Sequence, residues 1–336
     1  MRTLRKTALT AATMLTAFIA FIYQPFSSAI ASTPPAVDST ALQNHVRHLS
    51  VDLYPRSYDF PLNLNATADY IKNQWQAAGA RMTEQTFKVD GENYRNIIAT
   101  FGPTADANHP VTIVGAHYDS HGDKANGAKF VQGHSKDTHT PGADDNASGV
   151  AGLIELGKLL AKTPPSKPIT LVAYTLEEPP HYATANMGSV WHATALKAAH
   201  QPVNLMIALE MIGYFNDAPD SQKYPIPGMG LLYPSTGNFI AIVSRHADYS
   251  QTRALKGVMS GASTLPVYSI NTTPKITGVD FSDHRSYWQQ DYPAVMVTDT
   301  AFMRNHEYHQ SGDTFDRLDY TRMAQVVQGV FAFLVQ

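Results

Sequence analysis

The stretch VTIVGAHYDS (residues 111–120) decides the fold, because in it a short apolar run stops abruptly at residues with polar side chains. A run of this length and composition predicts a strand that is buried on both faces. ITLVAYTLEE (169–178) and NLMIALEMIGYF (204–215) have the same layout, and helix-type patterns separate the runs. Buried strands that alternate with helices predict an α/β fold, with a mixed, mostly parallel central sheet and helices on both faces.

Shorter patterns extend this sheet in both directions along the chain. Strand-like runs occur at 81–89, 96–101 and 293–299, and helix-like periodicity occurs at 66–80, 147–162, 187–200 and 322–335. No Pro-, Gly- or Ser-rich linker is long enough to separate two domains. We therefore expect a single domain over residues 32–336.

The first 31 residues have the layout of a secretory signal peptide. Arg2, Arg5 and Lys6 precede an uncharged run over 8–23, and small residues follow at Ala29 and Ala31. We expect cleavage after Ala31 and export to the periplasm or the medium, with no stable membrane span afterwards. The alternative is an uncleaved membrane anchor, although the run is short for a bilayer, which needs about 20 apolar residues.

Charge and cysteine content narrow the class of protein further. The formal net charge is −3, and it becomes −6 without residues 1–31, because these carry three positive charges and no negative one. The mature chain has no basic tract, which argues against a nucleic-acid partner. The chain has 0 cysteines, so an exported form would depend on its core and not on disulfides.

Residues with metal-binding side chains follow the buried strands. His117 ends the first run, Glu177 and Glu178 the second, and Glu210 the third. In α/β proteins with such a sheet, ligands bind beyond the carboxyl ends of the strands. We therefore expect these side chains to lie together on the rim that the carboxyl ends of the strands form. Imidazole and carboxylate ligands suit Zn²⁺. Carboxylates gathered there would repel one another unless a cation held them together.

A second cluster of acids lies at a turn before a helix. PGADDNASGVAGL (141–153) places Asp144 beside Asp145, and one acid would suffice to cap the following helix. The second acid therefore needs a partner elsewhere. NHEYHQSGDT (305–314) adds His306 and His309 as further candidates.

Six motifs in order resemble those of the M28 family of zinc metallopeptidases, which includes secreted bacterial aminopeptidases. They are GAHYDS, PGADDNASG, TLEE, ALEMIGYF, SDHRSYW and YHQSGDTFDRLD, and the resemblance spans residues 65–335. It implies a zinc exopeptidase with peptide substrates and two zinc ions per chain, and it favours an aminopeptidase that hydrolyses N-terminal residues over a carboxypeptidase. It makes His117 and Glu210 ligands of the first ion, Glu178 and His309 ligands of the second, and Asp145 the bridging carboxylate.

The resemblance also implies roles for residues around the metals. Glu177 would be the general base that takes a proton from the attacking water. Asp119 would accept the imidazole N–H of His117 and so fix its tautomer. Tyr308 is expected either to contact the developing oxyanion or simply to pack. Asp144 has no ligand role.

Other polar residues near the motifs are expected to have no part in metal binding. His306 is expected at the rim, and Asp283 and His284 in supporting or structural positions. Three histidines of the polar loop 120–141 are expected to be solvated: His121, His134 and His139.

Several alternatives stay open at this stage. Glutaminyl cyclases resemble the family but are mononuclear and lack the histidine that corresponds to His117. The presence of His117 argues against a cyclase. A carboxypeptidase of the same family is also compatible with the fold. A non-catalytic binding module would have no reason to keep Glu177, which binds no metal, so the full set of residues argues against it. EEPPHYATANMGS (177–189) is longer than is usual in the family, and Glu210 stands where many members have Asp. The longer segment is expected to shape the pocket rim, so the preferred substrate side chain stays open. The extra methylene of Glu210 can still reach a metal, and its mode of binding stays open. A serine hydrolase is not supported, because no G-x-S-x-G motif occurs.

Overall fold

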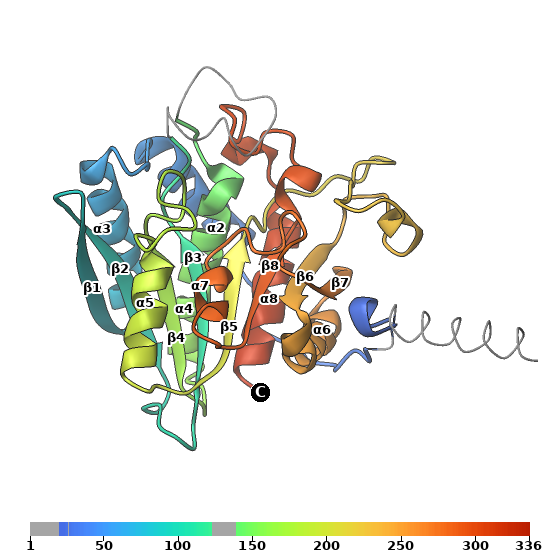
Figure 1. Cartoon of the computed structure of the whole chain (residues 1–336), viewed down its shortest axis with the longest axis horizontal. Helices are drawn as coiled ribbons and strands as arrows, with labels where there is room; N and C mark the ends of the chain where they lie inside the picture. Colours follow the sequence, from blue (N-terminus) through green and yellow to red (C-terminus); the bar gives the residue numbers. More distant parts are fainter. Residues whose placement is uncertain (1–19, 26, 123–138) are drawn as a thin grey trace, which may run out of the picture.

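The computed structural model describes residues 20–25, 27–122 and 139–336. Eight strands of this part form one sheet in the order β1-β2-β4-β3-β5-β8-β6-β7 (Figure 1). The strands are β1 (Arg81–Val89), β2 (Glu92–Phe101), β3 (Val111–His117), β4 (Ile169–Tyr174), β5 (Val203–Glu210), β6 (Ile240–Arg245), β7 (Val267–Thr272) and β8 (Ala294–Thr298).

The middle of the sheet is parallel and its flanks are mixed. β4, β3, β5 and β8 run parallel to one another. β1, β2 and β4 form antiparallel pairs on one side, and β6 is antiparallel to β8 but parallel to β7 on the other. All seven residues of β3 are buried, as its continuous apolar run predicts. The predicted mixed, mostly parallel sheet is confirmed.

Helices cover both faces of the sheet (Figure 1). α2 (Ser39–Arg47), α3 (Pro61–Ala77), α4 (Gly149–Lys162), α6 (Tyr249–Ala262) and α8 (Tyr320–Leu334) share one apolar cluster with one face of the strands. α5 (Gly188–Ala198) and α7 (His284–Trp288) pack on the other face in a second cluster. The parallel pairing of β3 with β4 and with β5 places the carboxyl ends of these three strands side by side.

Two features differ from the sequence-based expectation. The strand expected over 169–176 ends at Tyr174, and Leu176 adopts a positive φ of 62° before the two glutamates. The backbone thus leaves the sheet before Glu177, which turns the paired acids away from the strand. β6, α6 and β7 were not predicted. Ser, Thr, Asn or Lys interrupt the apolar residues of α6 and β7, and the apolar run of β6 is short, IAIV at 240–243.

The end of the predicted signal peptide contacts the body of the protein. Lys256 on α6 donates to the carbonyls of Tyr23 and Gln24, each at 3.0 Å, and the backbone N–H of Ile30 donates to Gly257 at 2.9 Å. Residues 1–19 lie outside the described part, so cleavage after Ala31 stays a prediction. Within the described residues, none of the helices has both the length and the apolar character that crossing a bilayer requires.

Candidate active site

Three strand ends deliver the first set of predicted site residues. His117 is the last residue of β3 and Glu210 the last residue of β5, and both are buried. Glu177 and Glu178 follow β4 after the Leu176 turn and are buried as well. The parallel register of these strands brings the side chains to one rim, as the sequence predicted.

The turn with paired acids is held in place by hydrogen bonds to two segments that lie later in the chain. The carboxylate of Asp313 accepts the backbone N–H of Asp144 at 3.0 Å and that of Asp145 at 3.1 Å. The amide of Asn146 donates to the carbonyl of Leu209 at 2.8 Å, one residue before Glu210. These contacts fix the side chain of Asp145 against the end of β5.

The two adjacent acids have different surroundings. The carboxylate of Asp144 accepts from the backbone N–H of Gly213 at 3.0 Å and from the amide of Asn305 at 3.2 Å. Burial raises the pKa of Asp144 well above its usual value, and the neighbouring Asp299 raises it further. Asp145 instead faces His117 and His309. Asp145 therefore faces metal-binding side chains and Asp144 does not, while the ligand role of Asp145 stays a prediction.

Two groups of buried side chains have the composition of a metal site. The first group is His117, Asp145 and Glu210, and the second is His121, Glu178 and His309. In the first, Nε2 of His117 lies 3.4 Å from Oδ1 of Asp145 and 3.4 Å from Oε2 of Glu210. In the second, Nε2 of His309 lies 3.1 Å from Oδ2 of Asp145 and 3.2 Å from Oε2 of Glu178. The two oxygens of Asp145 therefore face different groups.

These separations fit donors around a small divalent ion. Zn²⁺ bonds of about 2.1 Å in a tetrahedral arrangement place neighbouring donor atoms about 3.4 Å apart. Among the described residues, Nε2 of His117 and Oδ2 of Asp145 are buried without a hydrogen-bond partner. Burial works against ionised carboxylates, yet His309 and His121 lower the pKa of Glu178 well below its usual value. The donor chemistry and the spacing both suit zinc.

Glu177 borders the first group without belonging to it. Its Oε2 lies 3.9 Å from Nε2 of His117, farther than the donors of that group. Burial raises the pKa of Glu177 well above its usual value. His117 lowers this pKa, and the carboxylates of Glu210 and Glu178 raise it. A buried carboxylate with a raised pKa, next to a metal site, has the properties of a general base.

Asp119 differs in detail from its predicted role. Nδ1 of His117 lies 3.1 Å from the backbone carbonyl of Asp119 and 3.6 Å from its carboxylate, so the carbonyl is the closer acceptor. The carboxylate of Asp119 instead accepts the backbone N–H groups of Glu177 at 3.2 Å and Glu178 at 3.0 Å. Asp119 thus positions both glutamates, a contact that sequence spacing does not reveal.

His121 corrects a second expectation. It was expected to be solvated, but it is buried and belongs to the second group, with Nδ1 3.5 Å from Oε2 of Glu178. Its ring stacks on His309 with centroids 4.0 Å apart and planes 12° apart. The signal for this lies in HYDSH (117–121), because His121 is only four residues after the strand-end His117.

The remaining candidates fall outside both groups. His306 is exposed, as expected for a rim residue. His284 is buried, and its Nε2 bonds the carbonyl of Val279 at 2.8 Å, which gives it a structural place beside Asp283. His139 lies 3.1 Å from the carboxylate of Asp59. His134 lies outside the described residues.

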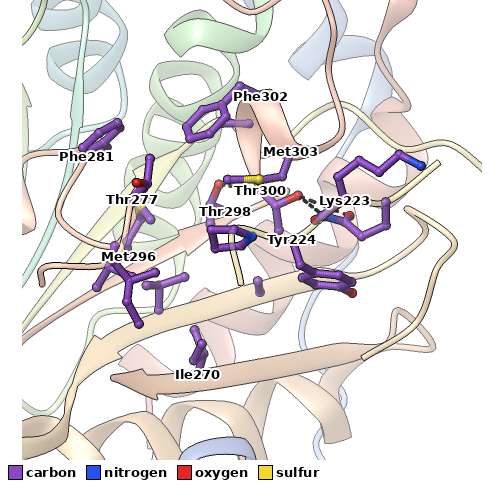
Figure 2. Close-up of a pocket in the computed structure, with 18 of the residues that line it drawn as sticks. Lys223, Tyr224, Ile270, Thr277, Phe281, Met296, Thr298, Thr300, Phe302 and Met303 are labelled. Carbon is purple, nitrogen blue, oxygen red and sulfur yellow. Dashed lines mark hydrogen bonds between the residues drawn. The ribbon is translucent and has the colours of Figure 1, made fainter. Parts of the chain in front are cut away.

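An apolar cavity opens beside the two groups. It encloses about 850 Å³, part of it open to solvent, and both Glu210 and Tyr308 line it. The ring of Tyr308 stacks on His309 with centroids 3.8 Å apart. Figure 2 shows the cavity between strands and the 300–303 turn, where its wall includes Ile270, Phe281, Met296, Phe302 and Met303.

Comparison with known proteins identifies the family. Residues 96–334, more than half of the chain, match the sequence pattern of peptidase family M28. The chain belongs to peptidase family M28. This M28 peptidase is a zinc metallopeptidase, as the six motifs implied, and its fold is the one shared by aminopeptidases and glutaminyl cyclases of known structure.

Three similar proteins show the range of this M28 peptidase's relatives. The uncharacterized protein YfbL of Escherichia coli is 49% identical over 312 residues, which cover 93% of this chain and 92% of that protein. A probable leucine aminopeptidase of Arthroderma otae is 24% identical over 71% of this chain, which spans only 56% of that protein. The crystal structure of a Bacteroides thetaiotaomicron glutaminyl cyclase matches with a TM-score of 0.68 and 17% identity, over 90% of this chain and 99% of the cyclase.

Proposed function

We propose that this protein is a dinuclear zinc aminopeptidase that releases N-terminal residues from peptides. The observation that carries the proposal is the position of Asp145, whose two oxygens face two separate groups of donors. His117 and Glu210 would hold one ion, and Glu178 and His309 the other. When ionised, Asp145, Glu178, Glu210 and Glu177 carry four negative charges, which two divalent cations would balance.

Glu177 is proposed to move the proton of the reaction. Bound zinc would polarise the scissile carbonyl and make the attacking water more acidic. Glu177 takes a proton from that water while the water oxygen forms a bond to the carbonyl carbon. It then gives the proton to the leaving amine nitrogen as the C–N bond breaks. Asp119, through the backbone N–H groups of Glu177 and Glu178, keeps both carboxylates oriented. The Tyr308 hydroxyl is the proposed donor to the developing oxyanion.

The charge around the site favours a substrate with a free amino terminus. A carboxypeptidase needs a fixed cation for the substrate carboxylate, whereas an amino terminus needs none. Among the described residues that line the cavity, Lys223 is the only basic one, and its side chain is exposed. Arg56 is buried, and its guanidinium donates to the carbonyls of Leu49, Tyr118, Pro141 and Gly142, so these bonds already engage it and it does not serve as a cation for a substrate carboxylate. The name of the Arthroderma otae relative supports the same choice.

Metal analysis combined with a substrate panel tests this proposal. Purified protein saturated with zinc should contain two ions per chain, and it should hydrolyse leucyl-anilide but not N-acetyl-leucyl-anilide. Cleavage of N-blocked peptides at a free C-terminus would instead favour a carboxypeptidase. One ion at saturation, with cyclisation of N-terminal glutaminyl peptides and no hydrolysis, would favour the cyclase alternative.

A further inference from the structure

We infer that His121 is an additional ligand of the second metal, so that protein donors surround this ion while the first ion keeps an open position. The inference rests on the dinuclear site proposed above and assigns different tasks to its two halves. The sequence motifs assign three ligands to the second ion, Asp145, Glu178 and His309. His121 would be the fourth.

The donor distances support this assignment. Nδ1 of His121 lies 3.5 Å from Oε2 of Glu178, and the same oxygen lies 3.2 Å from Nε2 of His309. Oδ2 of Asp145 is 3.1 Å from that His309 nitrogen. These values are close to the separation of about 3.4 Å between neighbouring donors of a tetrahedral zinc. His121, Glu178 and His309 also form a buried group whose donor atoms all lie within 4.8 Å of one another.

The position of His121 is fixed by its surroundings. Its ring stacks on the His309 ring, and its backbone carbonyl accepts the N–H of Thr140 at 2.9 Å. The preceding residue, Ser120, donates its backbone N–H to the carbonyl of Arg56 at 3.2 Å, and Arg56 is itself fully buried. A histidine that is buried and held beside a carboxylate in this way is preorganised as a ligand.

The two groups would then differ in coordination. Within the described residues, the first group offers three donors: His117, Asp145 and Glu210. Structural zinc sites use four protein donors, whereas catalytic sites use three and keep one position open. The open position would then lie at the first group, where Oε2 of Glu177 is 3.9 Å from Nε2 of His117. The second ion would be bound more tightly and would be the last one that a chelator removes.

The variant His121→Phe tests the ligand role. Phenylalanine keeps an aromatic ring against His309 but removes the nitrogen donor. Titration with zinc in competition with a chromogenic chelator should show that the tighter-binding step of the wild type is weakened by about 100-fold in the variant, the upper range for disturbed metal sites. The exposed His306, three residues before His309, supplies the control, and His306→Ala should bind both ions as the wild type does.

A cysteine at the same position provides a direct signature. The chain has 0 cysteines, so His121→Cys introduces the only thiol. With Co²⁺ in place of zinc, a thiolate ligand at position 121 should produce a near-ultraviolet charge-transfer absorption that the wild type lacks. Thiolates are good ligands for both metals. The intensity should saturate with one equivalent of Co²⁺, the equivalent that binds most tightly.

The outcomes separate this inference from the proposed function. Two ions bound with wild-type affinity in His121→Phe, or no charge-transfer absorption in a folded His121→Cys that holds two Co²⁺ ions, would overturn the ligand role. The dinuclear proposal would survive either result. A wild-type protein that binds only one ion at saturation would overturn both.

Discussion

At the scale of single residues, the site depends on adjacent acids whose side chains face different partners. Asp144 turns toward Gly213 and Asn305, while Asp145 turns toward two histidines. The same division occurs at the glutamate pair, where Glu178 lies in a donor group and Glu177 does not. Adjacent acids in the sequence therefore do different work because their environments differ.

The variant Glu177→Gln should fold and keep near-normal metal content, because the amide is nearly isosteric and the residue is in neither donor group. Its kcat should fall by about 10²–10⁴-fold, the usual contribution of a positioned general base, with little change in KM. Glu178→Gln should lose metal together with activity. Metal loss in both variants alike, or turnover retained in Glu177→Gln, would show that the base is misassigned.

The pair Asp144 and Asp145 offers a second contrast. Asp145→Asn should weaken binding at both metal groups, because both of its oxygens face donors. Asp144→Asn should retain two ions, because that side chain contacts Gly213, Asn305 and Asp299 and belongs to neither donor group. Elemental analysis at limiting zinc measures both. Equal loss in the two variants would mean that Asp145 is not the bridging carboxylate.

His192 on α5 should make the stability of the protein depend on pH. Burial lowers the pKa of His192 to about 4, and its Nδ1 lies 2.6 Å from the hydroxyl of Tyr287. The unfolded chain takes up a proton near pH 6.5 while the folded chain does not, so stability is fully present above pH 6.5 and falls toward pH 4. The loss from this residue is about 3 kcal/mol.

Denaturant unfolding at several pH values would measure this effect. The variant His192→Phe should lack this part of the pH dependence, while any metal release affects both proteins equally. The difference in unfolding free energy between variant and wild type should therefore move in favour of the variant from pH 6.5 to pH 4. A difference that stays constant over this range would contradict a depressed pKa.

At the scale of elements, the sequence located the strands that are buried on both faces better than it located the others. β3 is entirely buried, so its apolar run was unambiguous. β6 and β7 were missed, although together with β8 they carry residues that line the apolar cavity. β7 has burial that alternates irregularly, since it lies at the edge of the sheet. Edge strands need less apolar sequence, so their pattern is weaker.

The cavity wall should select substrates by side-chain size. Ile270 on β7 is half-buried in this wall, and Ile270→Trp would fill part of the space. We expect kcat/KM for leucyl- or phenylalanyl-anilide to fall about 10-fold or more, in the range that small changes in an apolar pocket produce. Alanyl-anilide serves as the internal control and should change little. An equal loss for all three substrates would place the substrate side chain elsewhere.

At the scale of the whole molecule, residues 21–24 of the predicted signal peptide contact helix α6 of the folded body. Lys256 is buried under Tyr23 and Gln24, and burial lowers its pKa to about 8. Phe21 stacks on Tyr249 with centroids 4.6 Å apart. Removal of residues 1–31 would end these contacts and expose Lys256 to water.

We expect the exported protein to begin near Ser32. Intact-mass spectrometry of protein from the native host checks this, with the protein expressed without residues 1–31 as the mass standard. Protein that starts at Met1 and is recovered with membranes would contradict cleavage. It would also mean that the contacts of residues 20–24 with α6 and β7 persist in the working protein.

The sequence by itself determined the family and the residues that the motifs name, because each motif is local and their order along the chain is specific. The structure then brought His117, Asp145, Glu178, Glu210 and His309 together in two groups of side chains that could hold metals, and their ligand roles stay predictions. These residues follow strand ends or turns, and parallel strands bring such positions to one rim regardless of the details of packing.

Only the tertiary structure decided the contacts between segments that are distant in the chain. It placed the Asp119 carboxylate under the N–H groups of Glu177 and Glu178, and it buried His121 against His309. A loop histidine and a strand-end acid have the same local pattern whether they are solvated or buried. Their burial depends on segments from 58 to 188 residues away, and a local pattern does not contain that distance.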